Sequence, residues 1–156
     1  MIIGVTGHRD AGQKPGELEE FARLFVARVV SNGATEIITG MARGWDLAVA
    51  EAADAIGIPF LAALPFPGQD QHWPKADQVR YFMALRNASR VHTISRLPLN
   101  NGYIKRDRWI VDHCDELHAL DSGRPSGSHT TVLYAEEVGR KVVPLWDDWT
   151  RFQARR

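Results

Sequence analysis

The sequence predicts an α/β fold in which a mostly parallel central sheet is covered by helices on both faces. Short apolar runs typical of buried strands alternate with longer stretches whose apolar residues recur at helical spacing. This alternation continues along all 156 residues, and glycines or prolines separate most of the elements. Repeated strand–helix units favour a parallel sheet, because each helix carries the chain back to the edge where the next strand starts.

Six apolar runs are expected to form the strands, and the first of them, Ile2–Thr6, is expected at the centre of the sheet. The other strands are predicted at 36–39, 59–64, 90–94, 116–120 and 141–145. Helices are predicted at 17–32, 47–55, 75–87, 103–113 and 132–139. The first helix illustrates the pattern, since Leu18, Phe21 and Phe25 share one apolar face and Asn32-Gly33 is a suitable stop.

The remaining segments complete one expected domain, residues 1–156. Residues 65–74 contain three prolines, so they are expected to fold irregularly over a surface or a site. Residues 146–156 form a C-terminal tail that is expected to be a short helix packed by Trp146, Trp149 and Phe152. The length suits a single domain of ordinary size.

Composition limits the class of protein. Hydrophobic residues make up 44% of the chain, which is enough for a core. The single cysteine, Cys114, excludes an intrachain disulfide framework and is expected to be a small buried hydrophobe. Because no apolar run is long enough to cross a membrane and the N-terminus lacks the pattern of a signal peptide, we expect a cytoplasmic protein without a membrane partner.

The charge balance argues against a surface that grips nucleic acid as a whole. The chain carries 19 Lys and Arg against 19 Asp and Glu, a formal net charge of zero. Proteins that bind nucleic acid over a broad face usually carry a basic footprint. A small anionic ligand needs only a few donors in a cleft, so this class of partner stays open.

The loop Asp121–Thr131 is the strongest candidate for an anion site. It lies between a predicted strand and a predicted helix, where the Gly- and Ser-rich sequence can turn backbone N–H groups toward one point. Ser126, Gly127 and Ser128 supply donors, and Arg124 could act as a phosphate clamp. Alternatively, Arg124 is simply an exposed charge, and Ser128 and Thr131 form a plain cap on a helix that faces solvent. No Ser-His-Asp spacing supports a catalytic role for His129.

Two earlier loops have similar chemistry. After the first strand, Gly7 would allow close approach of the backbone to a ligand, and Thr6 and Arg9 could contact phosphate or ribose. This loop lacks the dinucleotide-binding glycine fingerprint, so no nicotinamide cofactor, and indeed no cofactor, is expected. The alternative is a tight turn at Gly7 with His8 and Arg9 in solvent.

The loop after the second strand contains Gly40, Arg43, Gly44 and Asp46. The glycines permit a tight turn, Arg43 could neutralise an anion, and Asp46 could accept hydrogen bonds from ribose or serve as an ordinary helix cap. The carboxyl ends of parallel strands meet at one edge of the sheet, so the three loops are expected to form one site there. Asn101, Arg106 and Arg108 could reach it from their helix, or could form a mixed surface with Asp107 and Asp112. The histidines show no metal-ligand spacing, and no metal is expected.

These loops carry a family resemblance. The chain resembles the SLOG superfamily of Rossmann-like proteins, which includes the DprA/Smf DNA-processing proteins and the LOG phosphoribohydrolases, and is most similar to the small YspA/YpsA-like branch. The matching segments are GVTGHR at 4–9, ITGMARGWD at 38–46, PFPGQDQHWP at 65–74, RDRWIVDHCDELHAL at 106–120 and SGSHTTVLYAEEVGRKVV at 126–143.

The resemblance implies a Rossmann-like three-layer sandwich, a nucleotide or nucleotide-derived ligand, and a homo-oligomer. Carried over by position, it implies that the ligand contacts Gly7, His8, Arg9, Gly40, Arg43, Gly44, Asp46, Ser126, Gly127, Ser128 and Thr131. LOG enzymes have a PGGxGTxxE pattern in the third loop, whereas this chain has PSGSHTTVL without the glutamate. This departure argues against LOG-type hydrolysis.

Three functions therefore remain. The first, which we favour from the sequence, is binding or sensing of a nucleotide, with phosphate on residues 126–128, the sugar facing Asp46 and the base against Trp73 or Phe66. The second is hydrolysis of the N-glycosidic bond of a nucleotide, for which Asp46 and Glu51 are the candidate catalytic carboxylates and Asp10 a further one. The third is a DprA-like module that binds single-stranded DNA.

Overall fold

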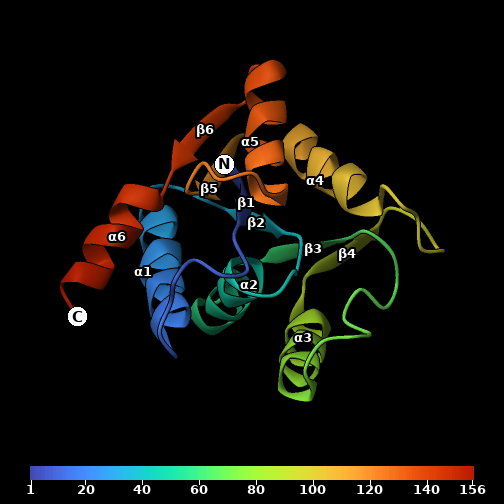
Figure 1. Cartoon of the computed structure of the whole chain (residues 1–156), viewed down its shortest axis with the longest axis horizontal. Helices are drawn as coiled ribbons and strands as arrows, with labels where there is room; N and C mark the ends of the chain where they lie inside the picture. Colours follow the sequence, from blue (N-terminus) through green and yellow to red (C-terminus); the bar gives the residue numbers. More distant parts are fainter.

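In the computed structural model, which describes all 156 residues, six strands and six helices alternate strictly along the chain (Figure 1). The strands are β1 (Ile2–Gly7), β2 (Glu36–Thr39), β3 (Phe60–Leu64), β4 (Arg90–Thr93), β5 (Glu116–Leu120) and β6 (Lys141–Pro144). The helices are α1 (Glu17–Ser31), α2 (Trp45–Ile56), α3 (Lys75–Asn87), α4 (Gly102–His113), α5 (Gly127–Glu137) and α6 (Trp146–Ala154). The elements match the predicted order.

All six strands belong to one sheet with the order β4-β3-β2-β1-β5-β6, and every pairing is parallel. This confirms the predicted α/β class and the central position of β1. After β1 the chain adds strands on one side as far as β4, and then crosses to the other side of β1 to form β5. The switch point of strand order therefore lies between β1 and β5, where ligands of such sheets usually bind.

Two apolar layers hold the helices against the sheet. The larger cluster packs the side of the sheet covered by α1, α2 and α3 and includes Phe25, Trp45 and Trp149, whose side chains are fully buried. The smaller cluster packs α4 and α5 against the opposite face through residues such as Ile110, Leu117 and Val132. Figure 1 shows these two helical layers on either side of the sheet, which makes the fold a three-layer sandwich.

The tail forms α6, which packs against α1. Trp149 lies in an edge-on contact with Phe21, with ring centroids 5.3 Å apart, and its indole N–H donates a hydrogen bond to the Ala11 carbonyl over 2.9 Å. Trp146 and Phe152 are partly buried against the same cluster, as the sequence predicted. None of the six helices combines the length and apolar character needed to span a bilayer.

One helix boundary differs from the prediction in a way that matters for the site. Helix α5 begins at Gly127, not at Val132, so the second half of the predicted 121–131 loop is the first turns of a helix. The residue that caps the helix is Ser126, not Ser128. The Ser126 hydroxyl accepts a hydrogen bond from the His129 backbone N–H over 3.1 Å. Gly, Ser and Thr are weak helix formers, and their composition hid the start of the helix.

Candidate functional site

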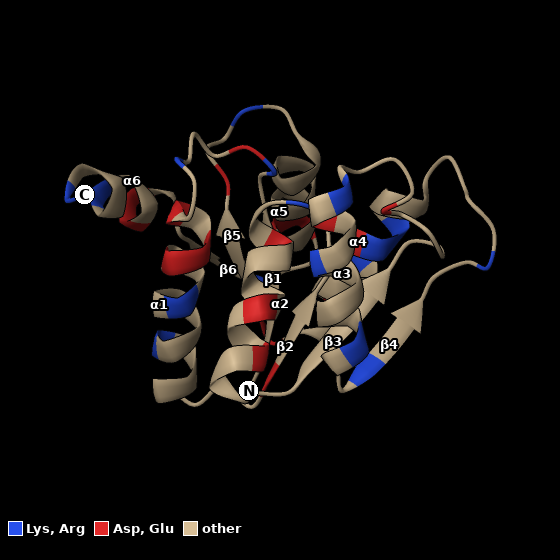
Figure 2. Cartoon of the chain, turned by 90° about the horizontal axis from the view of Figure 1, so that it is seen from below, with Lys and Arg blue, Asp and Glu red and all other residues tan.

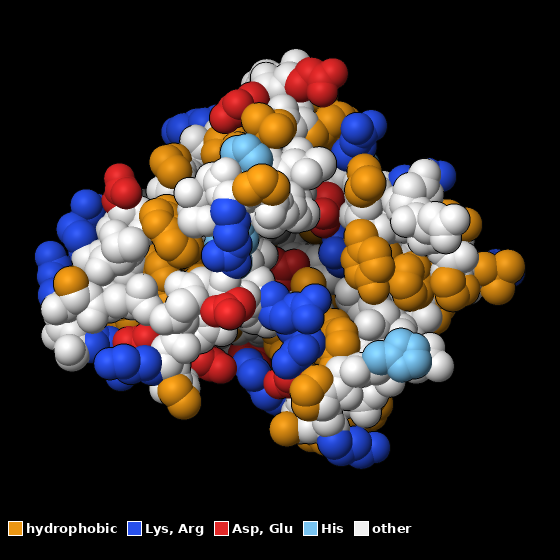
Figure 3. Space-filling view, in the orientation of Figure 1, with side chains coloured by type: hydrophobic (Ala, Val, Ile, Leu, Met, Phe, Trp, Pro, Cys, Tyr) orange, Lys and Arg blue, Asp and Glu red, His pale blue; other side chains and the backbone are white.

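A cavity of about 580 Å³ opens at the carboxyl edge of the sheet, beside the switch point between β1 and β5. It is enclosed by the loops after β1, β2 and β3 together with the beginnings of α4 and α5. In the space-filling view it is a hollow near the middle of the face, with Lys and Arg side chains on its border and an acidic side chain inside (Figure 3). The site is strongly polar, since only three of its 17 lining residues are hydrophobic.

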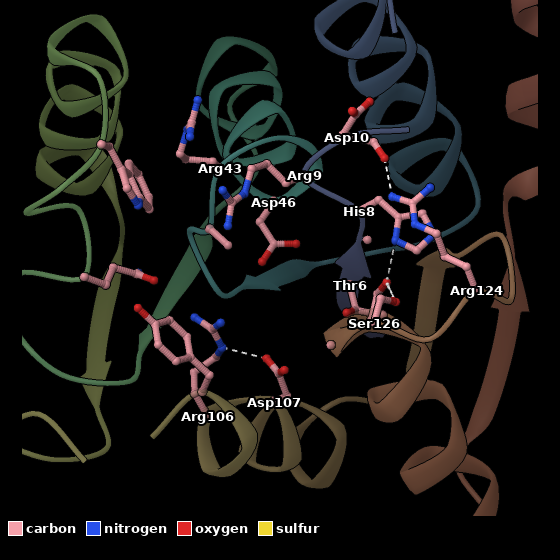
Figure 4. Close-up of a pocket in the computed structure, with 17 residues that line it drawn as sticks. Thr6, His8, Arg9, Asp10, Arg43, Asp46, Arg106, Asp107, Arg124 and Ser126 are labelled. Carbon is pink, nitrogen blue, oxygen red and sulfur yellow. Dashed lines mark hydrogen bonds and ion pairs between the residues drawn. The ribbon is translucent and has the colours of Figure 1, made fainter. Parts of the chain in front are cut away.

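The three loops that the sequence singled out do converge on this cavity. Figure 4 shows side chains from all of them around one space, with Asp46 and Arg106 extending into it from α2 and α4. The sequence-predicted residues that line it are Thr6, Gly7, His8, Arg9, Arg43, Asp46, Arg124, Ser126, Gly127 and Ser128. The predicted residues that do not line it are Gly40, Gly44, Glu51 and Thr131.

Packing within the protein accounts for three of the predicted glycines. A Cβ atom on Gly7 would lie 2.4 Å from the Trp45 ring, and one on Gly40 would lie 2.8 Å from the Arg106 guanidinium. Gly44 has a φ of +86° and lies against the backbone of Arg9. Gly127 differs from all three, because a Cβ atom there would meet no atom within 4 Å. Open space beside a cavity-lining glycine is what a ligand requires.

Glu51 and Thr131 are engaged elsewhere. The Glu51 carboxylate accepts a hydrogen bond from Arg80 Nε over 3.0 Å, and that arginine also contacts Glu19 and Asp77 in a half-exposed ion-pair network. Thr131 donates its hydroxyl to the Gly127 carbonyl over 2.8 Å and lines a neighbouring groove rather than the main cavity. Of the candidate catalytic carboxylates, Asp46 and the further candidate Asp10 line the cavity, and Glu51 does not.

Several lining residues come from outside the three loops. Gln69 and Trp73 belong to the irregular 65–74 segment, and Tyr103, Arg106 and Asp107 lie on α4. Trp73, Arg106 and Asp10 are candidates from the sequence and do line the cavity. Gln69, Tyr103 and Asp107 were not predicted from the sequence as site residues. For the residues of α4, the sequence feature that could have indicated the site is the cluster of aromatic and charged residues at the start of this helix. The same cluster also fits an ordinary solvent-exposed face.

Arg106 links the carboxyl ends of β2 and β3 at the base of the cavity. Its side chain is almost fully buried. Nη1 donates hydrogen bonds to two carbonyl groups, that of Gly40, which directly follows β2, and that of Ala63, which lies within β3. Nε donates to the Asp107 carboxylate over 2.7 Å. This arginine therefore satisfies two carbonyl groups and one carboxylate at the base of the site.

Asp46 is the most unusual group in the cavity. The residue is only 7% exposed, and its Oδ1 atom has no hydrogen-bond partner. Burial raises the pKa of its carboxyl to about 7, while the Arg106 charge lowers that pKa and the Asp107 charge raises it further. At neutral pH the group therefore exists in both protonation states and can accept or donate a hydrogen bond to a ligand.

We expect the free energy of unfolding to depend on pH because the pKa of Asp46 is raised. The folded-state pKa of about 7 exceeds the reference value of 3.8, so the folded protein binds the proton more tightly and its stability falls as the pH rises from about 4 to about 7. In Asp46→Asn this loss is absent. The free energy of unfolding of the variant relative to wild type should increase by on the order of 2–4 kcal/mol between pH 4 and pH 8. Urea unfolding at the two pH values measures this difference, and an unchanged difference would contradict the prediction.

His8 is held as a neutral imidazole beneath α5. Burial lowers its pKa most, and the Arg124 charge lowers it further. The Ser122 backbone N–H donates to His8 Nε2 over 2.9 Å, so the ring proton lies on Nδ1 and is donated to Ser128 Oγ over 3.0 Å. With its proton on Nδ1, His8 cannot serve as the base that activates Ser128. The neighbouring Asp121 carboxylate bonds instead to His129 Nδ1 over 2.9 Å.

The hydroxyl groups of Ser126 and Ser128 are in contact at the start of α5. Ser128 Oγ, which accepts from His8, lies 3.0 Å from Ser126 Oγ, and either hydroxyl can be the donor in this pair. Ser126 Oγ also accepts from the His129 backbone N–H, which fixes this oxygen beside the first turn of α5. The backbone N–H groups of Gly127 and Ser128 have no partner within the protein, because they belong to the first turn of α5. Two amides are thus available to an anion, and the Ser126 hydroxyl lies beside them.

Four arginines line the cavity, but their charges are balanced to different degrees. Arg43 pairs with Asp77 over 3.0 Å, Arg106 pairs with Asp107, and Arg124 donates to the Asp10 carbonyl. Arg9 makes no ion pair and is exposed at the mouth. An incoming phosphate would therefore meet at least one free guanidinium beside the amides of α5.

A family model and a solved structure point to the same protein family. Residues 1–155 match the family model described as DNA recombination-mediator protein A. DNA processing protein A from Streptococcus pneumoniae is similar, with a TM-score of 0.64 and 26% identity over 91% of this chain and 49% of that chain. The chain thus spans about half the length of that protein. A search of curated proteins gave no match.

Two further solved structures share the fold. DNA processing protein A from Helicobacter pylori, studied for its single-stranded DNA binding mode, has a TM-score of 0.67 and 16% identity over 92% of this chain and 64% of that chain. The structural-genomics target TM1055 has a TM-score of 0.63 and 14% identity over 90% of this chain and 71% of that chain.

Proposed function

Because the chain belongs to the DNA recombination-mediator protein A family, we propose that it binds single-stranded DNA, with one phosphate of the strand on the first turn of α5. The membership confirms the superfamily resemblance seen in the sequence, and it favours the third of the three functions over the first. The observation that carries the proposal is the cavity itself, in which two free backbone amides, the Ser126 hydroxyl and unpaired Arg9 surround one space at the switch point of the sheet.

The donors around α5 suit a phosphate group. The amides of Gly127 and Ser128 point out of a helix N-terminus, where the helix dipole favours negative charge. Arg124 approaches from the same loop, and its guanidinium can turn from the Asp10 carbonyl toward a phosphate oxygen. The phosphate of a nucleotide would thereby exchange water for charge-assisted hydrogen bonds.

The distribution of charge favours a single strand over a duplex. Figure 2 shows Lys and Arg interspersed with Asp and Glu along the helices, and the chain has no net charge. A duplex-binding protein would need a broader basic face to neutralise many phosphates at once. A single strand can instead bend a few nucleotides into a concave polar site.

A free nucleotide is the second candidate ligand. The cavity volume of about 580 Å³ lies within the usual range for small-molecule sites, and the unpartnered Asp46 carboxyl could bond to a sugar hydroxyl. Competition by mononucleotides against a bound oligonucleotide tests this reading. Chromatography of the same mixtures for released base tests N-glycosidic hydrolysis, with Asp46→Asn as the variant that should abolish it.

The main experiment measures binding of a fluorescein-labelled oligothymidylate by anisotropy over a range of salt concentrations. We expect the logarithm of the association constant to fall with the logarithm of salt concentration with a slope of about −2, as for roughly three neutralised phosphates. Arg9→Gln should weaken binding about tenfold at low salt and make the slope shallower by about 0.7, because one unpaired cation is lost.

Arg23→Gln is the matched control for this variant. Arg23 is an exposed arginine on α1 that makes no ion pair, so its replacement removes the same charge away from the cavity. Equal losses in the two variants would mean that binding reflects net charge and not this site. Absence of binding by the wild-type chain at low salt would overturn the proposal.

A further inference from the structure

A second, smaller groove adjoins the main cavity. It has a volume of about 210 Å³ and lies between the first turns of α4 and α5. Tyr103, Asp107 and Gly127 line both spaces, so the groove continues from the cavity across the N-terminus of α5. Its other walls include Ile104, Thr131 and Tyr134.

The groove differs from the cavity in its chemistry. Four arginines and three aspartates line the main cavity beside its two aromatic residues, Trp73 and Tyr103. The groove has two tyrosines and an isoleucine, and Asp107 and Arg108 are its only charged residues. Tyr103 and Ile104 leave 45% and 48% of their surfaces exposed, respectively, on the α4 side. Exposed apolar surface beside a polar anion site suits a ligand that has both characters.

Tyr134 is held in place on the α5 side of the groove. Its hydroxyl donates a hydrogen bond to the Asp112 carboxylate over 2.9 Å, and the Arg108 guanidinium lies over its ring, 4.8 Å from the centroid. Arg108 therefore extends the aromatic wall with a flat cationic group. Such a guanidinium can stack on a base and approach a neighbouring phosphate.

We propose that this groove is a nucleobase subsite, which takes the base of the nucleotide whose phosphate lies on the first turn of α5. The inference rests on the proposed function, since it assumes that a phosphate occupies the amides of Gly127 and Ser128. The sugar would cross over Gly127, where the missing side chain leaves open space. The base would lie between the Tyr103 and Tyr134 walls, and stacking there is expected to raise affinity by on the order of tenfold.

The test uses short oligothymidylates in which one residue at a time is replaced by 2-aminopurine or by an abasic sugar. At one position, 2-aminopurine fluorescence should be quenched on binding, and the abasic sugar at that position should weaken wild-type binding about tenfold. Tyr134→Leu should weaken binding of the intact strand about tenfold and abolish the quenching, but should bind the abasic strand as wild type does. Tyr134→Phe, which keeps the ring and loses only the hydroxyl, should retain the quenching.

A second variant guards against a folding defect in Tyr134→Leu. Ile104 is half-exposed, so Ile104→Asn should preserve the melting temperature while it places a polar amide in the groove and weakens binding several-fold. Trp73→Leu tests the other side of the main cavity, where the sequence had placed the base.

The outcomes separate the two proposals. If wild type binds no oligonucleotide, the proposed function fails together with this inference. If wild type binds but neither the abasic sugar nor Tyr134→Leu changes affinity, or if Trp73→Leu removes the quenching while Tyr134→Leu does not, only the nucleobase subsite is overturned.

Discussion

Gly127→Leu is expected to reduce oligonucleotide affinity at least a hundredfold while the protein stays folded. Gly127 is the first residue of α5, lies beside Ser126 and Ser128, and borders both the cavity and the groove. A leucine side chain would fill the open space that the strand must cross. The backbone conformation is not in the left-handed region, and leucine is a better helix former than glycine, so the substitution should not destabilise the protein.

A size series at this position provides the internal control. Gly127→Ala should melt at or slightly above the wild-type temperature and lose much less affinity than the leucine variant, because one methyl group occupies only part of the space. Calorimetry gives the melting temperatures and anisotropy gives the affinities. Unchanged affinity in Gly127→Leu would show that the strand does not pass over the start of α5.

Arg106→Leu is expected to lower the free energy of unfolding by about 3–5 kcal/mol. The substitution would leave the carbonyl groups of Gly40 and Ala63 without their buried donor and the Asp107 carboxylate without its partner. It would also remove the positive charge that lowers the pKa of Asp46. Urea unfolding at neutral pH measures the loss.

Arg86→Leu is the control for this prediction. Arg86 is exposed on α3 and makes no ion pair, so its replacement should change the free energy of unfolding by no more than about 0.5 kcal/mol. A loss of less than 1 kcal/mol in Arg106→Leu would mean that water satisfies the carbonyl groups, and the structural role assigned to this arginine would be wrong.

The order of the elements could be predicted from the sequence because it depends on local patterns. Runs such as Ile2–Thr6 and Phe60–Leu64 are apolar enough to be buried on both faces of a parallel sheet, and the 17–31 helix has one continuous apolar face. The prediction failed at the start of α5. There, Ser126 stabilises the first turn through its hydroxyl, and this contribution does not appear in residue propensities.

The glycines show a second limit of the sequence. Gly7 and Gly40 lie at strand ends and Gly127 lies at the start of α5, and all three had similar expected roles in ligand binding. The first two are needed because Trp45 and Arg106 occupy the space where a side chain would be, whereas Gly127 faces open space. Trp45 and Arg106 are distant in sequence from the strand ends that they support. No local pattern could therefore distinguish a glycine that packs against a side chain from one that faces open space.

Apolar periodicity and parallel connections are sufficient to predict the layers of the sheet and the convergence of three loops. Which polar groups face the cavity depends on tertiary packing instead. Asp46 and Glu51 lie on the same helix but point about 140° apart around its axis, so one enters the cavity and the other meets Arg80. The burial that raises the pKa of Asp46 to about 7 also depends on tertiary packing, because that carboxyl loses its water only after the loops and α4 have closed around it.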